Sequence, residues 1–368
     1  MAAAYHHTWQ RICRDGWCIA RLFWCAFSFG YSRGLVGVDR MGDGRPFYFA
    51  SISKGKLMKE AIIVILNANA GLGHSEQLKL DVIAKFRAHG VDADVTLAAD
   101  GAHMVALARA AVEKRAAVVV AGGGDGTINA VAAQLVHSET ALGVLPLGTL
   151  NHFAKDLRLP LDIDSAIRTI AEGVKIRVDT AEVNGQIFIN NSGLGLYPNI
   201  VRSREQQQRR FGRSKWMAFF WATINALRRY PFLRVHMCLD GIDHEHKTAF
   251  VFIGNNDYSI DGLTLGTRQK LTDGLLSVFV APSTGRLGLL GLAVRALFGH
   301  LRESKDFDAL TAKELIIESR HKKLRVSTDG EVTMMQTPLR YQIHAASLAV
   351  FVNGEALPTS EKGSLCAP

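Results

Sequence analysis

Cysteine is scarce in this sequence, with 5 among 368 residues. The number is odd, and no two cysteines stand at zinc-ligand spacing beside histidines. Small secreted domains that depend on disulfides are much richer in cysteine. We therefore expect a reducing, cytoplasmic setting, with no structural disulfide and no metal–thiolate site.

The sequence also lacks a long hydrophobic run. No stretch reaches the roughly 20 apolar residues that a membrane-spanning helix requires. The best candidate, from Gly16 to Tyr31, is short and contains Arg21. No small-residue cleavage site clearly follows it, so the signal-peptide pattern is weak as well.

Acidic residues are too few to balance the basic ones, because 34 Asp and Glu face 43 Lys and Arg, giving a net charge of +9. With 48% hydrophobic and 21% charged residues, the chain is neither disordered nor a coiled coil. The length suggests about two domains. The positive charge is compatible with a nucleotide, a nucleic acid or an anionic membrane surface as partner.

The first 57 residues differ from the rest. They carry eight Lys and Arg against three acids, together with three of the five tryptophans. They show no sustained helical or strand period. We expect residues 1–57 to be an atypical extension, either disordered or non-native with Met58 as the true start. A basic, aromatic membrane anchor is the alternative.

From Met58 the chain alternates predicted strands and helices. This order is typical of a doubly wound parallel sheet, and it predicts an α/β nucleotide-binding domain over residues 58–180. The strands are expected at Ala61–Leu66, Ala93–Leu97, Ala117–Ala121 and Ala141–Leu145, and the helices at Ser75–His89, Ala102–Lys114 and Thr127–Leu135.

After about Val178 predicted strands follow one another mostly without helices. This predicts a second domain over residues 181–357, a mainly antiparallel β-sandwich, and leaves open a return of its last segment to the first domain. Residues 358–368 are expected to be a tail. The strands are expected at Ala181–Ile189, Leu233–Leu239, Thr248–Ile253, Leu275–Val280, Glu314–Glu318 and Leu324–Thr328, with helices near Ser214–Arg229 and Leu287–His300.

A glycine-rich segment lies between a predicted buried strand and a predicted helix. It runs from Gly122 to Thr127 and reads Gly-Gly-Gly-Asp-Gly-Thr. Glycines let the backbone approach a phosphate, and the following helix offers free N–H groups and the positive end of its dipole. It is not a Walker loop, because the Gly-Lys-Ser/Thr ending is missing. The segment suits a polyphosphate, with Asp125 facing a bridging Mg²⁺ or the proton of the nucleophile.

Two further loops are expected at the same edge of the sheet. The segment Pro146–Asp156 reads Pro-Leu-Gly-Thr-Leu-Asn-His-Phe-Ala-Lys-Asp. Within it, Thr149 and Asn151 can hydrogen-bond phosphate, ribose or substrate. Lys155 either offsets phosphate charge or lies on a solvated helix face. The segment Asn67–Gly73 follows the first strand and would form a lip for a nucleotide.

Together these three loops resemble the diacylglycerol kinase catalytic family, in its bacterial lipid kinase branch. The family pattern has Asn-Pro-x-Ser-Gly, Gly-Gly-Asp-Gly-Thr and Pro-Leu-Gly-Thr-x-Asn-x-Phe-Ala, and the chain matches the second and third closely. Further matches lie at Ile253–Asn256, Leu271–Leu276 and Thr328–Glu331. The resemblance covers about Lys59 to Gly354. It implies an ATP- and Mg²⁺-dependent kinase of a diacylglycerol-like or sphingoid lipid hydroxyl, with residues 181–357 as the lipid-substrate domain.

The resemblance also implies which residues bind ATP. Asp125 would in addition lie near the transferring phosphoryl group and count among the catalytic residues. The nucleotide-binding residues would be Asn67, Gly71, Thr96, Gly123, Gly124, Asp125, Gly126, Thr127, Asn129 and Thr149.

The metal ligands and the general base follow from the same resemblance. A structural Mg²⁺ would be bound by the carboxylate of Asp273 and by the main-chain carbonyls of Lys270 and Leu275. Asp329 and Glu331 would supply the general base and its partner, in an order that the sequence leaves open. Asp329 and the glycine after it also form the dipeptide that favours a type I′ hairpin turn, and both roles can hold at once.

The first loop departs from the family pattern. It has Ala68 for the proline, Ala70 for the serine, and Leu72 where a basic residue often follows the glycine. Lys155 or an arginine would therefore have to neutralise the phosphates.

A basic, aromatic stretch predicts contact with a membrane surface. Between Arg202 and Arg234 the chain has nine Lys and Arg and one acid, and it encloses the segment Trp216–Trp221. This pattern is typical of interfacial binding, with a core-packing helix as the alternative. For a second apolar stretch, Leu287–Phe298, we favour the core-packing interpretation. We expect a lipid substrate and peripheral membrane association, and a homodimer stays open.

Two other functions stay open. NAD kinases share Gly-Gly-Asp-Gly-Thr, so a soluble substrate is one alternative, although the segment Pro146–Ala154 argues against it. A non-catalytic nucleotide or lipid sensor is the other; the altered first loop favours it and the intact acidic residues oppose it. Nucleic acid is not expected as a partner, because residues beyond the extension hold only 35 basic against 31 acidic side chains.

Overall fold

The structure is a computed structural model that describes residues 38–40, 46–48, 62–68, 75–195, 232–261, 264–268, 270–281 and 308–354. The chain divides into two compact units, Met1–Ser51 and Ile52–Pro368. In the first unit the described residues are the strands β1 (Val38–Arg40) and β2 (Pro46–Tyr48), which pair antiparallel.

Several predictions fall on residues outside the described part. They concern the remainder of residues 1–57, Gly71, the helices at Ser214–Arg229 and Leu287–His300, and the tail 358–368. Where the structure does describe the chain, none of the helices is both long enough and apolar enough to cross a membrane.

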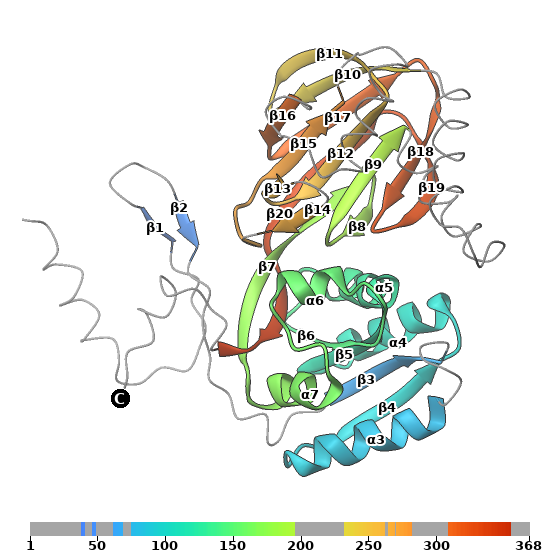
Figure 1. Cartoon of the computed structure of the whole chain (residues 1–368), viewed down its shortest axis with the longest axis vertical. Coiled ribbons are helices and arrows are strands. Elements are labelled where there is room, and N and C mark those ends of the chain that lie inside the picture. Colours follow the sequence, from blue (N-terminus) through green and yellow to red (C-terminus); the bar gives the residue numbers. More distant parts are fainter. Residues whose placement is uncertain are drawn as a thin grey trace, which may run out of the picture. The chain divides into compact units, whose positions relative to one another are not determined.

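The second unit begins with alternating strands and helices. Its strands run parallel in the order β4-β3-β5-β6 (Figure 1). Every element predicted in this region is confirmed to within two residues, and α6 and α7 are additional. The elements are β3 (Ile62–Asn67), α3 (Ser75–Ala88), β4 (Ala93–Ala98), α4 (Gly101–Glu113), β5 (Val118–Gly123), α5 (Asp125–Leu135), β6 (Ala141–Pro146), α6 (His152–Asp156) and α7 (Ile163–Glu172).

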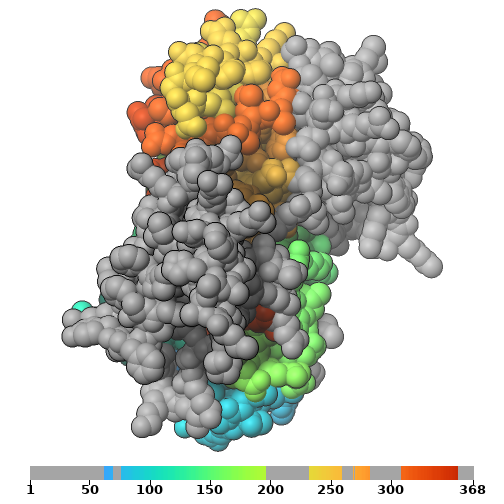
Figure 2. Space-filling view, turned by 90° about the vertical axis from the view of Figure 1, so that its left-hand side faces the viewer, coloured from blue at the N-terminus to red at the C-terminus, as the bar shows by residue number. Residues whose placement is uncertain are grey.

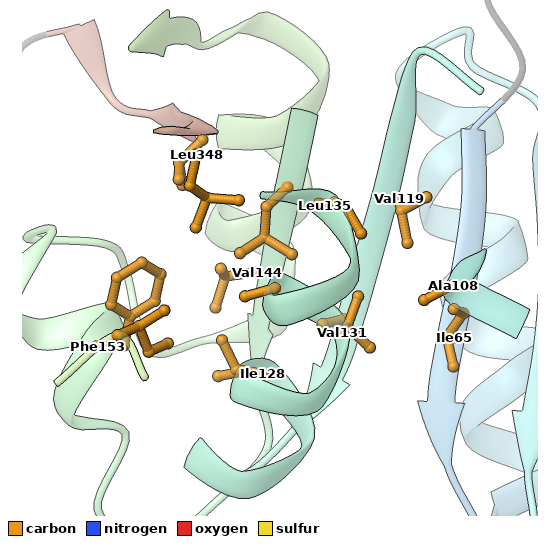
Figure 3. Close-up of a cluster of buried hydrophobic side chains, with 14 of the residues drawn as sticks. Ile65, Ala108, Val119, Ile128, Val131, Leu135, Val144, Phe153 and Leu348 are labelled. Carbon is orange, nitrogen blue, oxygen red and sulfur yellow. The ribbon is translucent and has the colours of Figure 1, made fainter. Parts of the chain in front are cut away.

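Buried clusters lie on both faces of this parallel sheet. On one face, Ile128, Val131 and Leu135 of α5 pack with Val119 of β5 and Val144 of β6 (Figure 3). The cluster on the other face contains Val82 and Phe86 of α3 and Ala166, Ile167 and Ile170 of α7. Burial on both faces explains the nearly continuous apolar strands and confirms the doubly wound arrangement.

Antiparallel strands make up the rest of the second unit. Six of them form a sheet in the order β16-β15-β12-β9-β18-β19, and others extend the parallel sheet to ten strands. The buried cluster between the two sheets confirms the sandwich. The strands are β7 (Val174–Val183), β8 (Gln186–Phe188), β9 (Asn191–Gly195), β10 (Leu233–Leu239), β11 (Ile242–Thr248), β12 (Phe250–Asn255), β13 (Tyr258–Asp261), β14 (Thr264–Arg268), β15 (Leu276–Val280), β16 (Asp308–Ala312), β17 (Glu314–Ser319), β18 (Lys323–Thr328), β19 (Glu331–Gln336) and β20 (Leu339–Val352).

Two long strands connect the parallel sheet with the sandwich. The first half of β20 pairs with β17, and near its end Val350 pairs parallel with Leu142 of β6. A bulge around Ala346, which has a φ of 48°, separates the halves, and β7 follows β20 on both sides of it. In Figure 2 the yellow residues, which belong to antiparallel strands, lie at one end of the coloured surface, and the cyan residues of the parallel part lie at the other end.

Two predicted strands are wrong in extent. The segment Ala181–Ile189 is not one strand, because Asn184 and Gly185 turn the chain from β7 into β8 with φ angles of 47° and 85°. The segment Thr248–Ile253 crosses from β11 into β12. Polar β11 was missed because it shows no apolar alternation. The predicted strands at Leu233–Leu239, Leu275–Val280, Glu314–Glu318 and Leu324–Thr328 are confirmed to within one residue.

Candidate active site

The glycine-rich segment forms the turn from β5 into α5. The helix begins at Asp125, and Gly124 at its N-cap has no side chain to cap the first N–H groups. Gly123 is required for packing, since a Cβ there would lie 2.5 Å from Oγ1 of Thr127. The N–H groups in the first turn of α5 therefore have no carbonyl partner within the helix and can donate to an anion.

Two neighbouring loops meet this turn. Asn67, at the end of β3, donates from Nδ2 to Oγ1 of Thr127 at 3.1 Å. Gly148, after β6, packs against Gly124 so closely that a Cβ on Gly148 would lie 2.5 Å from the Cα of Gly124. Thr149 follows and is exposed. The glycine-rich segment, the start of the Pro146–Asp156 segment and Asn67, the first residue of the third loop, thus converge on one edge of the parallel sheet.

Two more predicted ATP ligands lie nearby on regular elements. Thr96 is half-buried on β4, where it pairs with Ile65 of β3. Asn129 lies in α5, and its Oδ1 is buried with no hydrogen-bond partner among the described residues. Asn129 is therefore available to a ligand that approaches α5.

The loop between β6 and α6 is held by its own side chains. Asn151, with a φ of 51°, accepts at Oδ1 from the N–H of Gly148 and donates from Nδ2 to the Gly148 carbonyl, at 3.0 and 2.8 Å. Its side-chain amide therefore supports the loop. Lys155 is exposed on α6. Asp125 accepts at Oδ1 from the N–H of Phe153 at 3.4 Å, which ties the glycine loop to α6.

Gly148→Ala tests the contact between the two loops. The new Cβ would meet backbone, which cannot rotate away, so we expect the free energy of unfolding to fall by about 1–3 kcal/mol. Thermal unfolding measures this change. Gly101→Ala, at the start of α4 with nothing within 4 Å of its Cβ, is the matched control. Equal stability of the two variants would show that the loops do not touch.

The Asp-Gly-Glu segment forms the β18–β19 hairpin. Asp329 and Gly330 have φ angles of 47° and 89°, which confirms the predicted two-residue turn. Glu331 is exposed, and its Oε1 lies 3.9 Å from the position of a Cβ on Gly126. The structure therefore brings a carboxylate from the sandwich to the first turn of α5.

Asp329 has a different environment from Glu331. Its carboxylate accepts three hydrogen bonds of 2.8 to 2.9 Å from the main-chain N–H groups of residues 189–191. Burial raises the pKa of Asp329 to about 6, although these N–H groups and Arg268 lower it. Asp329 thus fixes main chain, whereas no described residue forms a hydrogen bond or an ion pair with the Glu331 carboxylate.

The ionisation of Asp329 gives a pH dependence with a defined sign. Its folded pKa of about 6 exceeds the roughly 3.9 of an unfolded aspartate, so its contribution is fully present below pH 4 and lost towards pH 6. Relative to Asp329→Asn, the wild-type free energy of unfolding should fall by about 2 kcal/mol between pH 4 and 6.5. Urea unfolding of both proteins across this range measures it. A constant difference would contradict the assignment.

The three predicted metal ligands lie together between β14 and β15. The carboxylate of Asp273 is 4.0 Å from Nζ of Lys270, and the Leu275 carbonyl accepts from the N–H of Asn256 at 2.9 Å. Burial raises the pKa of Asp273, Lys270 lowers it, and Asp257 raises it. In the described ranges no group of three or more His, Cys, Asp or Glu side chains is arranged to bind a metal. The candidate donor set is thus one carboxylate with two carbonyls.

Sequence reasoning missed Asp179, a buried residue of β7. Its Oδ2 accepts from the N–H of Gly274 at 2.8 Å, and its Oδ1 accepts from the N–H of Ala346 at 2.7 Å. Burial raises the pKa of this carboxyl. Asp179 joins the loop of the three candidate metal ligands to the bulge of β20, and a single aspartate in a strand carries no sequence signal for this role.

An ion pair was missed as well. Nη2 of Arg268 lies 2.7 Å from Oδ2 of Asp156, and their side chains are 0% and 9% exposed. Asp156 is the last residue of the Pro146–Asp156 segment, and this position was the one sequence signal that it could have a role in the site. Arg268 belongs to no motif.

Family models cover both parts of the second unit. Residues 61–183 match the diacylglycerol kinase catalytic domain, and residues 199–352 match the YegS C-terminal NAD kinase beta sandwich-like domain. The "Probable lipid kinase YegS-like" of Klebsiella pneumoniae (strain 342) is 31% identical over 223 residues, covering 59% of this chain and 72% of that protein. Its namesake in Chromohalobacter salexigens is 31% identical over 269 residues, covering 70% and 84%.

A solved structure shares the fold. The crystal structure of a diacylglycerol kinase from Bacillus anthracis str. Sterne superposes with a TM-score of 0.61 at 22% identity, covering 81% of this chain and 98% of that one. With the sequence matches, the chain therefore belongs to the lipid kinase family that combines a diacylglycerol kinase catalytic domain with a YegS-type C-terminal domain.

Proposed function

We propose that this protein transfers the γ-phosphoryl group of ATP to the hydroxyl of a diacylglycerol-like or sphingoid lipid, with Mg²⁺ as cofactor. Phosphoryl transfer needs held phosphates, compensated charge and an acceptor for the hydroxyl proton. The observation that carries the proposal is the Glu331 carboxylate beside the open first turn of α5. The names of the relatives support a lipid as substrate.

The glycine loop fits the polyphosphate of ATP. A Cβ on Gly126 would have one described atom within 4 Å, the Oε1 of Glu331, so no other described group crowds the backbone at this point. Phosphate oxygens there would accept from the N–H groups of the first turn and face the helix dipole. Asn67 and Thr149 flank the same turn and would contact the nucleotide.

The candidate metal site fits Mg²⁺ by its donor type. A carboxylate from Asp273 and carbonyls from Lys270 and Leu275 are the hard oxygen ligands that Mg²⁺ prefers. The Lys270 side chain is 73% exposed, so its ammonium can turn to solvent when a cation binds. When bound, Mg²⁺ would hold these three oxygens together and so order this loop.

The residues of the site divide the work of the reaction. Glu331 would take the proton of the attacking hydroxyl at a carboxylate oxygen. Asp329 would hold the turn that carries Glu331, through its bonds to residues 189–191. Asp125 would lie near the transferring phosphoryl group, fixed at the start of α5 and against α6.

Asp273→Ala tests the metal assignment. The variant loses the one side-chain oxygen in the donor set, so we expect weaker Mg²⁺-dependent stabilisation, with the thermal midpoint rising less on adding Mg²⁺ than in the wild type. Differential scanning calorimetry with and without Mg²⁺ checks this. Loss of activity without change in stability or Mg²⁺ dependence would contradict a structural metal role.

The reaction would take place at the cytoplasmic membrane surface, with the protein bound peripherally and without nucleic acid. A homodimer is compatible with this setting. The stretch that motivates surface binding begins at Arg202, and its residues up to Pro231 lie outside the described part of the chain.

The deciding experiment is transfer of label. The full chain is incubated with ATP labelled at the γ-phosphate, Mg²⁺ and mixed lipid extracts, and the organic phase is separated. Labelled lipid that disappears with Glu331→Gln supports the proposal. Label confined to the aqueous phase would indicate a soluble substrate, and ATP binding without transfer would indicate a sensor.

A further inference from the structure

Arg268, the last residue of β14, carries a fully buried guanidinium group. Its Nε and Nη2 both reach Oδ2 of Asp156, at 2.8 and 2.7 Å. Its Nη1 donates to the carbonyl of Ile189 at 2.6 Å, and its Nη2 donates to Oδ1 of Asn190 at 2.8 Å. One side chain thus joins the end of α6 to the segment before β9.

The residues before β9 that accept hydrogen bonds from Arg268 belong to the same segment, 189–191, that holds the Asp-Gly-Glu turn. The N–H groups of residues 189–191 donate to the carboxylate of Asp329. The hydroxyl of Tyr258 donates to a carbonyl of the same segment at 2.8 Å, and its ring lies 5.4 Å from the Arg268 guanidinium carbon. Two residues beyond Asp329, Glu331 reaches the glycine loop.

Stability alone is a weak reason for such a buried pair. Desolvation of both charges offsets much of their attraction, and apolar residues of similar volume often stabilise a protein at least as well. The planar guanidinium of Arg268 donates in several fixed directions at once, which an ammonium cannot reproduce. The pattern of partners therefore points to a geometric role.

We infer that Asp156 and Arg268 are positioning residues that hold the Asp329–Glu331 turn in register with the glycine loop. Asp156 ends the helix that follows the loop of Gly148, and Gly148 packs against Gly124. The ion pair of Asp156 and Arg268 thereby connects the glycine loop, which would bind phosphate, with the turn that carries Glu331. The expected effect on catalysis rests on the proposed function. That the ion pair connects α6 with the segment that holds Asp329 rests on the observed contacts alone.

Arg268→Lys and Asp156→Asn test this inference in the full chain. Both should lower kcat for lipid phosphorylation by about 10- to 100-fold, because a displacement of about 1 Å is costly for a positioned group. The KM for ATP should change less than about threefold, since the glycine loop is intact. Amide hydrogen exchange of residues 189–191 should become faster than in the wild type, while exchange in β3 and β5 stays unchanged.

The pair of half-buried Arg177 and exposed Glu139 supplies the controls. Arg177→Lys and Glu139→Gln change the same chemical groups at a 2.8 Å pair and should leave kcat and exchange at residues 189–191 unaltered. Unchanged exchange at 189–191 in folded Arg268→Lys would overturn the inference, as would faster exchange with unchanged kcat. If the wild type phosphorylates no lipid, the proposed function fails, and exchange still decides whether the pair holds the turn.

Discussion

Glu331→Gln should lower kcat by about 100- to 10,000-fold while ATP still binds, because the amide cannot accept the proton of the attacking hydroxyl. The substitution keeps the size of the side chain and the turn that presents it. Glu331 is exposed, and the turn is fixed by Asp329 instead. We therefore expect the thermal midpoint to stay within about 2 °C, where 1 kcal/mol corresponds to roughly 2–4 °C. Steady-state kinetics and calorimetry on the same preparation separate the two effects.

A second glutamate makes the loss of activity specific. Glu318→Gln changes an exposed residue of β17, in the other sheet of the sandwich, and should keep full activity. Glu331→Asp retains a carboxylate but withdraws it by one methylene, so an intermediate rate is expected. If Glu331→Gln keeps the wild-type rate, the base lies elsewhere, and the central observation of the proposed function is lost.

The parallel part of the fold could be predicted closely from the sequence. Apolar runs such as Ile62–Asn67 and Val118–Gly123 become strands buried on both faces, and that environment imposes the same continuous pattern on the sequence. The alternation of these strands with helices then predicted a doubly wound parallel sheet. The boundaries moved by one or two residues, because glycines such as Gly123 serve both the strand and the turn.

The antiparallel part was predicted less completely because its hairpins are short and some strands are polar. Asn184-Gly185 and Asp240-Gly241 both adopt two positive φ angles, as Asp329-Gly330 does. Asn-Gly and Asp-Gly are typical dipeptides of two-residue hairpin turns, so the sequence contained the signal for both turns, although only the turn at Asp329-Gly330 was predicted. By contrast, the strand β11 alternates charged residues with histidines, so hydrophobic patterning could not reveal it.

For the candidate site, motifs identified the loops but not the side chains that arrange them. Asn67, Thr127 and Glu331 were foreseen and lie around one helix end. Arg268 and Asp179 were not, because a buried ionic group is defined by its partners in space. The order of Asp329 and Glu331 also needed geometry, since the φ of the turn and the N–H groups of residues 189–191 assign the anchoring role to Asp329.

Asp125→Asn should lower turnover by at least about 100-fold, because the amide would be a much weaker ligand than the carboxylate for a Mg²⁺ ion that bridges the phosphates. The asparagine retains an oxygen that can accept from the N–H of Phe153, as Oδ1 of Asp125 does at 3.4 Å. The link between α5 and α6 is thus preserved while the negative charge is removed. A large loss of kcat with unchanged unfolding would therefore assign the effect to charge beside the transferring phosphoryl group.

Asp162→Asn is the matched control for this prediction, because Asp162 also lies at a helix N-terminus and accepts from a main-chain N–H, that of Ser165 at 2.8 Å. It belongs to α7, whose first turn lies beside the last turn of α3 through the ion pair of Asp164 and Lys85. In a parallel sheet that places it at the edge opposite the glycine loop. Full activity in Asp162→Asn beside inactive Asp125→Asn would locate the chemistry at α5. Full activity in both variants would show that the Asp125 carboxylate takes no part in the reaction. The glycine loop would then bind phosphate through its backbone N–H groups alone.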